Sequence, residues 1–174
     1  MHRFPVTIAS VGREALGANT TGESNTAVGT AALDANTTAS NSTAVGHAAL
    51  GANTTGANNT AVGKDALGGV TTGHSNVAVG SLALSAGNGV YCTAVGQQAL
   101  ENNGNDYNSA LGWSALEANS TGQFNTAIGA EALRAHTTGS NVTALGYNAL
   151  GSNTTASNNV AVGKDALKSC TTRS

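Results

Sequence analysis

The sequence predicts an all-β fold, a parallel β-solenoid (β-roll) of ten coils with about 17 residues in each coil. Three observations predict this fold. A short phrase recurs at nearly constant spacing, a glycine marks the same place in every repeat, and the segments between glycines are too short for a pair of helices.

The repeated phrase is Ala-Val-Gly-x-x-Ala-Leu, as residues 27–33 (AVGTAAL) and 44–50 (AVGHAAL) show. Its glycine recurs every 17 residues, except for two steps of 16 residues that end at Gly96 and Gly112. Ten repeats fill residues 10–174, and residues 1–9 form an N-terminal segment in which residues 1–5 are a partial cap. The ten glycines are Gly12, Gly29, Gly46, Gly63, Gly80, Gly96, Gly112, Gly129, Gly146 and Gly163.

Each coil is expected to hold two short strands joined by turns. The residues before each glycine, such as 25–28 (NTAV), are compatible with a strand and are bounded by glycine. One turn follows the glycine, and the other is the corner that often reads Thr-Thr-Gly or Thr-Thr-Ala. With about 4.8 Å between coils, ten coils make a rod on the order of 48 Å long.

The constant letters predict which side chains face the core. Every repeat has Ala-Leu after two variable residues, so the leucines form an apolar spine and the variable residues face water. We expect Val28 and its counterparts to form the opposing wall of the core. Because successive strand residues point to opposite faces, the alanine before each valine then points outward.

A small apolar residue on an outward face has two explanations. Either the coil geometry requires it, or this face is covered by another chain along the length of the rod, which is the interpretation we favour. The alanines of this predicted oligomer interface are Ala27, Ala44, Ala61, Ala78, Ala94, Ala110, Ala127, Ala144 and Ala161.

The phrase Asn-Thr-Ala-Val-Gly-x-x-Ala-Leu resembles the head repeats of YadA-type trimeric autotransporter adhesins. It is also similar to the Asn-Thr-Ala-Val-Gly repeats of trimeric tail-fibre-like and surface proteins of phages and bacteria. The resemblance covers residues 10–172, with a longer period than that of the adhesins. It implies that three chains each wind a left-handed parallel β-roll and that their strands pack about the threefold axis.

Asparagine recurs in two columns, one on each side of the corner. Stacked Asn side chains form hydrogen-bonded ladders and also satisfy turn backbone, which is the interpretation we favour. Several of these residues also form the acceptor motif Asn-x-Ser/Thr, so glycan attachment is the alternative. These acceptor motifs begin at Asn19, Asn36, Asn53, Asn119 and Asn153.

Adjacent threonines stack at the corner, for example Thr37-Thr38 and Thr54-Thr55. Turn chemistry explains most such pairs. Regular Thr arrays on flat β-solenoids also resemble ice-binding proteins, although those arrays place Thr on alternate residues so that two side chains share a face. An ice-binding Thr-Thr column is therefore an alternative function.

The two short repeats lose one residue just before Tyr91 and Tyr107, and Phe124 stands at the equivalent place in the next coil. Two interpretations remain open. The rings either fill space left by the deletion, or they contact a ligand such as a sugar ring or another apolar surface. Trp113, on the variable turn nearby in sequence, joins them as a candidate ligand contact.

Several function classes find no support. Only 9% of residues are charged and the net charge is −2, which does not favour nucleic acid. No apolar run is long enough for a membrane helix. The histidines fall in different columns, and we identify no catalytic residue, no metal site and no cofactor. Cys92 and Cys170 lie four to five coils apart, roughly 20 Å, which exceeds disulfide reach within one chain.

The sequence therefore predicts a non-enzymatic, structural or adhesive fibre segment that works outside the cell, at a cell or virion surface. Its expected partners are two further copies of itself in a homotrimer and a host-surface glycan or protein receptor. The open coil ends also favour rods that stack end to end, which makes a self-stacking extracellular filament a further alternative.

Overall fold

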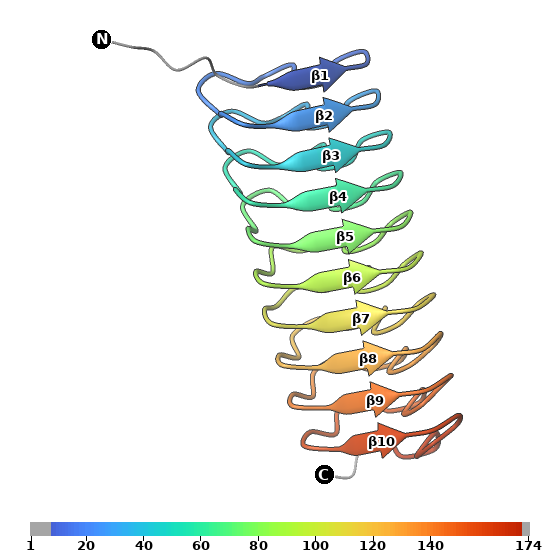
Figure 1. Cartoon of the computed structure of the whole chain (residues 1–174). Coiled ribbons are helices and arrows are strands. Elements are labelled where there is room, and N and C mark those ends of the chain that lie inside the picture. The colour runs from blue at the N-terminus through green and yellow to red at the C-terminus, as the bar shows by residue number, and fades with distance from the viewer. Residues whose placement is uncertain (1–7, 172–174) are drawn as a thin grey trace.

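The computed structural model describes residues 8–171 and is a rod of stacked coils, each of which contributes one strand to a single sheet (Figure 1). The sheet is parallel, and its strands follow one another in chain order. This confirms the predicted parallel β-solenoid, while the partial cap expected at residues 1–5 lies outside the described residues. The strands are β1 (Ala9–Val11), β2 (Thr26–Val28), β3 (Thr43–Val45), β4 (Thr60–Val62), β5 (Val77–Val79), β6 (Thr93–Val95), β7 (Ser109–Leu111), β8 (Thr126–Ile128), β9 (Thr143–Leu145) and β10 (Val160–Val162).

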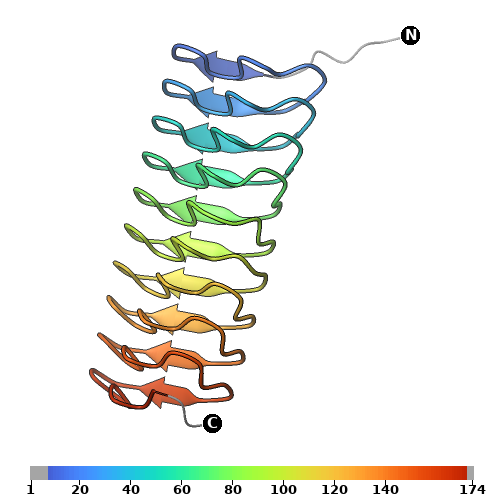
Figure 2. The same ribbon diagram turned by 180° about the vertical axis from the view of Figure 1, so that it is seen from behind.

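Each coil has one strand instead of the two that we expected. The wall behind the sheet is a run of turns (Figure 2), because alternate residues adopt positive φ there, such as Ala31 at 57° and Leu33 at 51°. Left-handed residues bend the chain away from an extended strand. The turns still bond from coil to coil, since the Leu33 N–H donates to the Ala49 carbonyl at 3.0 Å.

The leucine spine is present as predicted. In every coil the leucine has a φ of 48–55°, and Leu33 through Leu150 of this column are fully buried. A left-handed residue costs roughly 1–2 kcal/mol, whereas burying a leucine side chain contributes about 1.5–3 kcal/mol. Burial therefore offsets the strained turn on which the leucine sits.

The strand residues face the opposite way from the prediction. The alanine in the middle of each strand points into the coil, and Ala27, Ala44 and Ala61 are fully buried. The valine that follows points outward, with 38% of Val28 exposed. The expected Val wall is wrong because the interior is thin. Leucines from the turn wall occupy it, and only a methyl group fits opposite them.

Glycine is constant after each strand for a steric reason. Gly46 has a φ of 139°, a conformation that side chains strongly disfavour. A Cβ on Gly46 would also lie only 2.5 Å from the carbonyl oxygen of Gly63 in the next coil. The coils can therefore stack this closely only if the residue lacks a side chain.

The two asparagine columns are buried ladders, as predicted. In the first, Asn36 Nδ2 donates to Asn19 Oδ1 at 2.7 Å. In the second, Asn59 Nδ2 donates to the Gly73 carbonyl at 2.8 Å, and Asn59 Oδ1 accepts the Asn76 N–H at 3.0 Å. Within these two columns, four of the five acceptor motifs for a glycan begin at fully buried residues, where a glycan does not fit in the folded coil: Asn36, Asn53, Asn119 and Asn153.

The two 16-residue coils do not shift the sheet. Thr93 of β6 pairs with Val77 of β5 and with Ser109 of β7, in the same register as the full-length coils. The missing residue is taken from the corner, so the strands and the leucine spine continue without interruption.

Candidate functional site

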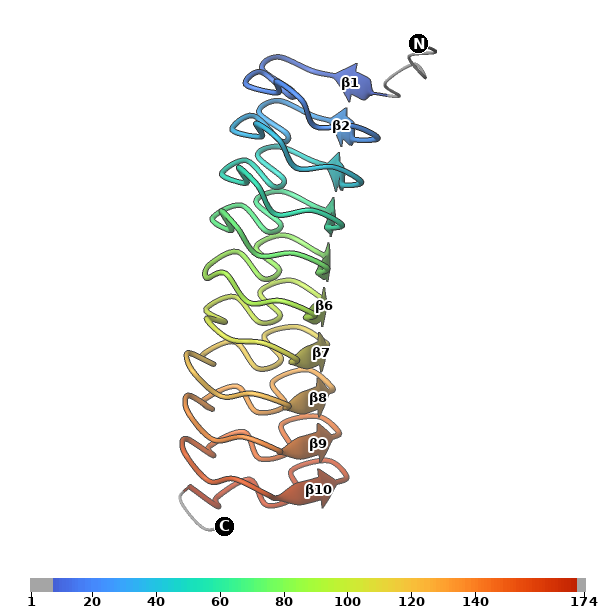
Figure 3. The ribbon, with the colours of Figure 1, turned by 90° about the vertical axis from the view of Figure 1, so that its left-hand side faces the viewer.

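The first and third residues of β1–β10 form what we call the outer sheet face. These strands lie in one row along one side of the rod, with the turn wall on the other side (Figure 3). The first position is mostly threonine, and the third is always Val, Leu or Ile. Side chains at i and i+2 of a strand share a face, so the two columns run side by side.

The third column leaves an apolar strip in contact with water. Val45 is 36% exposed and Leu145 is 43% exposed, and exposure rises to 66% for Val162 at the last coil. Ten consecutive coils span on the order of 48 Å. Among the described residues, none of the strands β1–β10 carries a charged residue, so the outer sheet face is uncharged from β1 to β10.

The residue type in this strip is aliphatic in every coil, whereas the residue type in the exposed column after the glycine varies. The residue after each glycine is also exposed or half-buried, yet it ranges from Lys64 to Trp113 to Ala130. Solvent alone tolerates that variety. An aliphatic residue in all ten coils therefore indicates a requirement at the outer sheet face that the turn column lacks.

The predicted alanine interface is not on the surface. In the order given above, the nine alanines are between 0% and 3% exposed, and they belong to the core of their own coil. They cannot contact another chain without unfolding this one. The alternation of residues along each strand correctly predicted an alanine face and a valine face. The prediction placed the alanine face outside and the valine face inside, which is the reverse of the structure.

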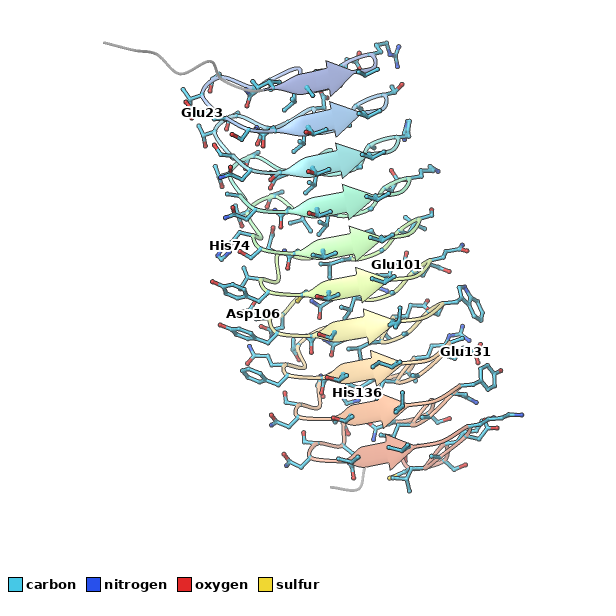
Figure 4. All side chains as sticks on the ribbon, viewed as in Figure 1. Glu23, His74, Glu101, Asp106, Glu131 and His136 are labelled. Carbon is cyan, nitrogen blue, oxygen red and sulfur yellow. The ribbon has the colours of Figure 1, made fainter. Side chains whose placement is uncertain are left out.

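Tyr91, Tyr107 and Phe124 form what we call the aromatic ladder, on the corner before β6, β7 and β8. The ring centroids of Tyr91 and Tyr107 are 5.4 Å apart, and those of Tyr107 and Phe124 are 5.0 Å apart, with nearly parallel planes. His74 contacts the Tyr91 ring edge-on at 5.5 Å. Figure 4 labels His74 and Asp106, the residue before Tyr107, at one edge of the rod, so the ladder lies along that edge.

The ladder residues have an unusual backbone. Their φ values are 56–58°, and in the six other coils where the structure describes this left-handed position it holds Ser or Asn, as at Ser24 and Asn141. Asn tolerates that conformation, whereas a bulky residue there is uncommon. Aromatic residues on three consecutive coils are therefore not what the turn itself favours.

The rings also do not fill an internal space. Each is about half exposed, and Phe124 lies in a full-length 17-residue coil that has lost nothing. These two facts argue against the interpretation that the ladder compensates for the deletion. The facing sides of neighbouring rings cover one another within the stack.

Trp113 lies apart from the ladder. It follows β7 on the turn, and the Arg134 guanidinium stands 5.9 Å from its ring centroid. Arg134 also pairs with Glu131 at 3.3 Å, and Glu131 lies at the opposite edge of the rod from His74 and Asp106 (Figure 4). The four aromatic residues proposed from the sequence therefore do not form one ligand site.

The threonine pairs divide into two roles. The first Thr of a pair bonds to the next coil, as Thr37 Oγ1 donates to the Thr54 carbonyl at 3.1 Å. The second, such as Thr38 or Thr55, is exposed. One hydroxyl of each such pair thus belongs to the corner, which supports the turn interpretation.

Groups with reactive chemistry are sparse. Across residues 8–171, no group of three or more His, Cys, Asp or Glu side chains is placed to hold a metal ion. Over the same residues, no helix has the length and hydropathy needed to cross a membrane. Burial raises the pKa of the Cys92 thiol above its usual value, since desolvation disfavours the thiolate.

Comparison of this chain with models of protein families, with curated proteins and with solved structures found no match in any of the three.

Proposed function

We propose that this protein is a non-enzymatic structural rod that assembles as a homotrimer through its outer sheet face and serves as a fibre or adhesin segment outside the cell, at a cell or virion surface. The observation that carries the proposal is the outward-facing aliphatic residue on all ten strands, which is exposed on nine of them and half-buried at Val95. The number of chains follows from the resemblance to YadA-type head repeats, whose strands pack about a threefold axis.

The length of the apolar strip determines how much free energy its burial in an assembly would contribute. Full burial of a Val, Leu or Ile side chain contributes about 1.5–3 kcal/mol, so completing the burial of ten partly exposed ones contributes on the order of 5–15 kcal/mol per chain. Association costs an estimated ~4–15 kcal/mol in lost freedom. A rod of two or three coils would contribute less than most of that cost, whereas the contribution of ten coils is comparable to it.

The first experiment is the solution mass of the chain by light scattering across a dilution series. A trimer has three times the 17.0 kDa mass of one chain. A second sample carries Val62→Lys and Val79→Lys, which place two charges on the outer sheet face. We expect this variant to be a monomer, because the charges would lose water in the assembly without gaining a partner.

The matched control carries Thr30→Lys and Ser81→Lys. Both positions belong to the turn column that already holds Lys64 and Lys164. This variant adds the same charge and is expected to remain a trimer. A monomeric parent chain, or a face variant that stays trimeric, would overturn the proposal.

A monomer would leave the outer sheet face open to solvent and would favour the ice-binding alternative. That alternative uses the corner column, where the second threonine of a pair, such as Thr38 or Thr55, is exposed. The next measurement would then be ice-crystal growth in the presence of the chain. A large, length-dispersed species would instead favour the self-stacking filament.

A further inference from the structure

A uniform interface does not specify how chains align along the rod. The third strand residue is aliphatic in every coil, so a chain displaced by one coil meets almost the same surface. Such a slip gives up the contact of one coil in ten. Repetitive strand surfaces are prone to alternative registers unless a distinct feature opposes them.

The aromatic ladder is the feature that interrupts the repeat midway along the rod. It spans three consecutive coils, and two of them are the 16-residue coils. The same position is Ser or Asn in the six other coils where the structure describes it, for example Asn58 and Asn158. The ladder therefore distinguishes the centre of the rod from both of its ends.

The ladder borders the outer sheet face. Tyr107 stands two residues before Ser109, the first residue of β7, and only the buried Asn108 separates them. Figure 4 shows Asp106, the residue before Tyr107, at the edge of the rod beside the strands. A chain that covers the outer sheet face over β6–β8 would lie against this edge as well.

The apolar area of the ladder suits a contact with protein. Three half-exposed aromatic side chains offer on the order of 225–375 Å². That value approaches the largest apolar patch on an ordinary monomer, and such patches mark interaction sites. Tyrosine is also among the residues that carry most of the binding energy in interfaces.

We propose that the aromatic ladder sets the axial register of self-assembly, and that its partner is a second copy of this chain. The rings meet their complementary surface on the neighbouring chain only when the two rods are aligned coil for coil. This inference rests on the proposed function, because it assumes that the outer sheet face joins chains.

The test measures register directly. One pool of chains carries a nitroxide on Thr38→Cys and another carries a gadolinium label on Thr155→Cys, both at exposed corners seven coils apart. Cys92→Ser and Cys170→Asn remove the native thiols with residues that their columns already hold at Ser42 and Asn153. The two pools are unfolded, mixed and refolded, and pulsed dipolar spectroscopy reads the distances between unlike labels.

The ladder variant is Tyr91→Asn, Tyr107→Asn and Phe124→Asn, which restores the residue that four other coils use. It is expected to keep its fold and mass but to show several distances, because a slip of one coil moves a label by about 4.8 Å along the rod. The unmodified ladder is expected to give the distances of one aligned state. The control variant, Trp113→Ser with Tyr147→Thr, removes two equally exposed aromatic rings elsewhere and is expected to keep the aligned distances.

Three outcomes would overturn the register role. One is an assembled ladder variant with unchanged distances, another is a control variant with equally scattered distances, and the third is a folded ladder variant that no longer assembles. The third result would make the ladder the principal contact instead of a register device. A parent chain that does not assemble refutes the proposed function itself and is recognised from the mass alone.

Discussion

Asn88 Oδ1 accepts the backbone N–H of Thr71 at 2.8 Å and that of Thr72 at 2.9 Å. In a full-length coil a backbone carbonyl accepts the two corresponding hydrogen bonds, since the N–H groups of Thr54 and Thr55 both donate to the Thr71 carbonyl. The side chain of Asn88 therefore replaces the carbonyl that the 16-residue coil has lost. The ladder of hydrogen bonds at the corner continues across the deletion for this reason.

Asn88→Ala is expected to destabilise the chain by about 1–2 kcal/mol, because the backbone N–H groups of Thr71 and Thr72 and the Thr71 hydroxyl lose their acceptor at a partly exposed corner. Urea unfolding measures the change, and amide exchange at Thr71 and Thr72 should become faster. Replacing Asn88 by Thr-Thr restores a 17-residue coil and its backbone carbonyl, so this control should keep the stability of the parent. Equal loss in both variants would contradict the explanation.

His136 stands in the first asparagine column and is fully buried. Its Nδ1 lies 2.7 Å from Asn153 Oδ1, and its Nε2 lies 2.8 Å from the Gly139 carbonyl. His136→Asn is expected to change stability by less than about 1 kcal/mol, because Asn makes the corresponding bonds in other coils. His136→Ala should cost ~2–4 kcal/mol through a cavity and unpaired acceptors. If chemical denaturation gives similar values for both variants, the ring is not part of the ladder.

Gly63→Ala tests the close approach of neighbouring coils. Gly63 has a φ of 134°, and an added Cβ would meet the Gly80 carbonyl oxygen at 2.6 Å. We expect a loss of ~2–4 kcal/mol from strain and displacement of the next coil. Gly51→Ala is the matched control, since its column also holds Asp34 and Arg134 and it should be neutral or slightly stabilising. Thermal unfolding of the two variants decides between them.

Cys92 should react slowly with iodoacetamide in the folded chain. Desolvation by burial raises the pKa of its thiol above the ordinary 9.0, so less thiolate is present at a given pH. Cys170, which is half-buried, should be labelled first, and mass spectrometry after brief labelling measures the order. Labelling of Cys92 first would contradict this account.

The same shift predicts a dependence of stability on pH. A thiol whose pKa is higher in the folded state than in the unfolded state contributes stability that is fully present below pH 9.0. That contribution is lost as the pH rises from 9.0 through the raised pKa of the folded state. Cys92→Ser, with the residue that Ser42 already places in this column, should remove this part of the alkaline decline in unfolding free energy.

The sequence predicted the parts of the fold that depend on one coil stacking on the next. The glycine period predicted the parallel sheet, and the recurring Ala-Leu predicted the leucine spine. The asparagine columns predicted ladders such as Asn36 on Asn19. These predictions hold because identical residues at a fixed period must lie above one another in a solenoid.

The second wall could not be predicted in the same way. Ala31 and Leu33 have a positive φ, and neither alanine nor leucine is a residue type that favours this conformation. Their conformation follows from closing a short coil and burying the leucine. The stacking of Tyr91, Tyr107 and Phe124 was expected from their spacing, but their exposure and the separation of Trp113 from them were visible only in the structure.

The sequence by itself determined how many coils the described rod has, which residues stack, and that each strand has two unlike faces. Only the tertiary structure decided which face is inside. Because successive strand residues point to opposite faces, Ala27 and Val28 must point in opposite directions. Which of the two points into the coil depends on the width of the interior. The leucines of the turn wall leave room for a methyl group alone, so alanine lies inside and the valines remain on the outer sheet face.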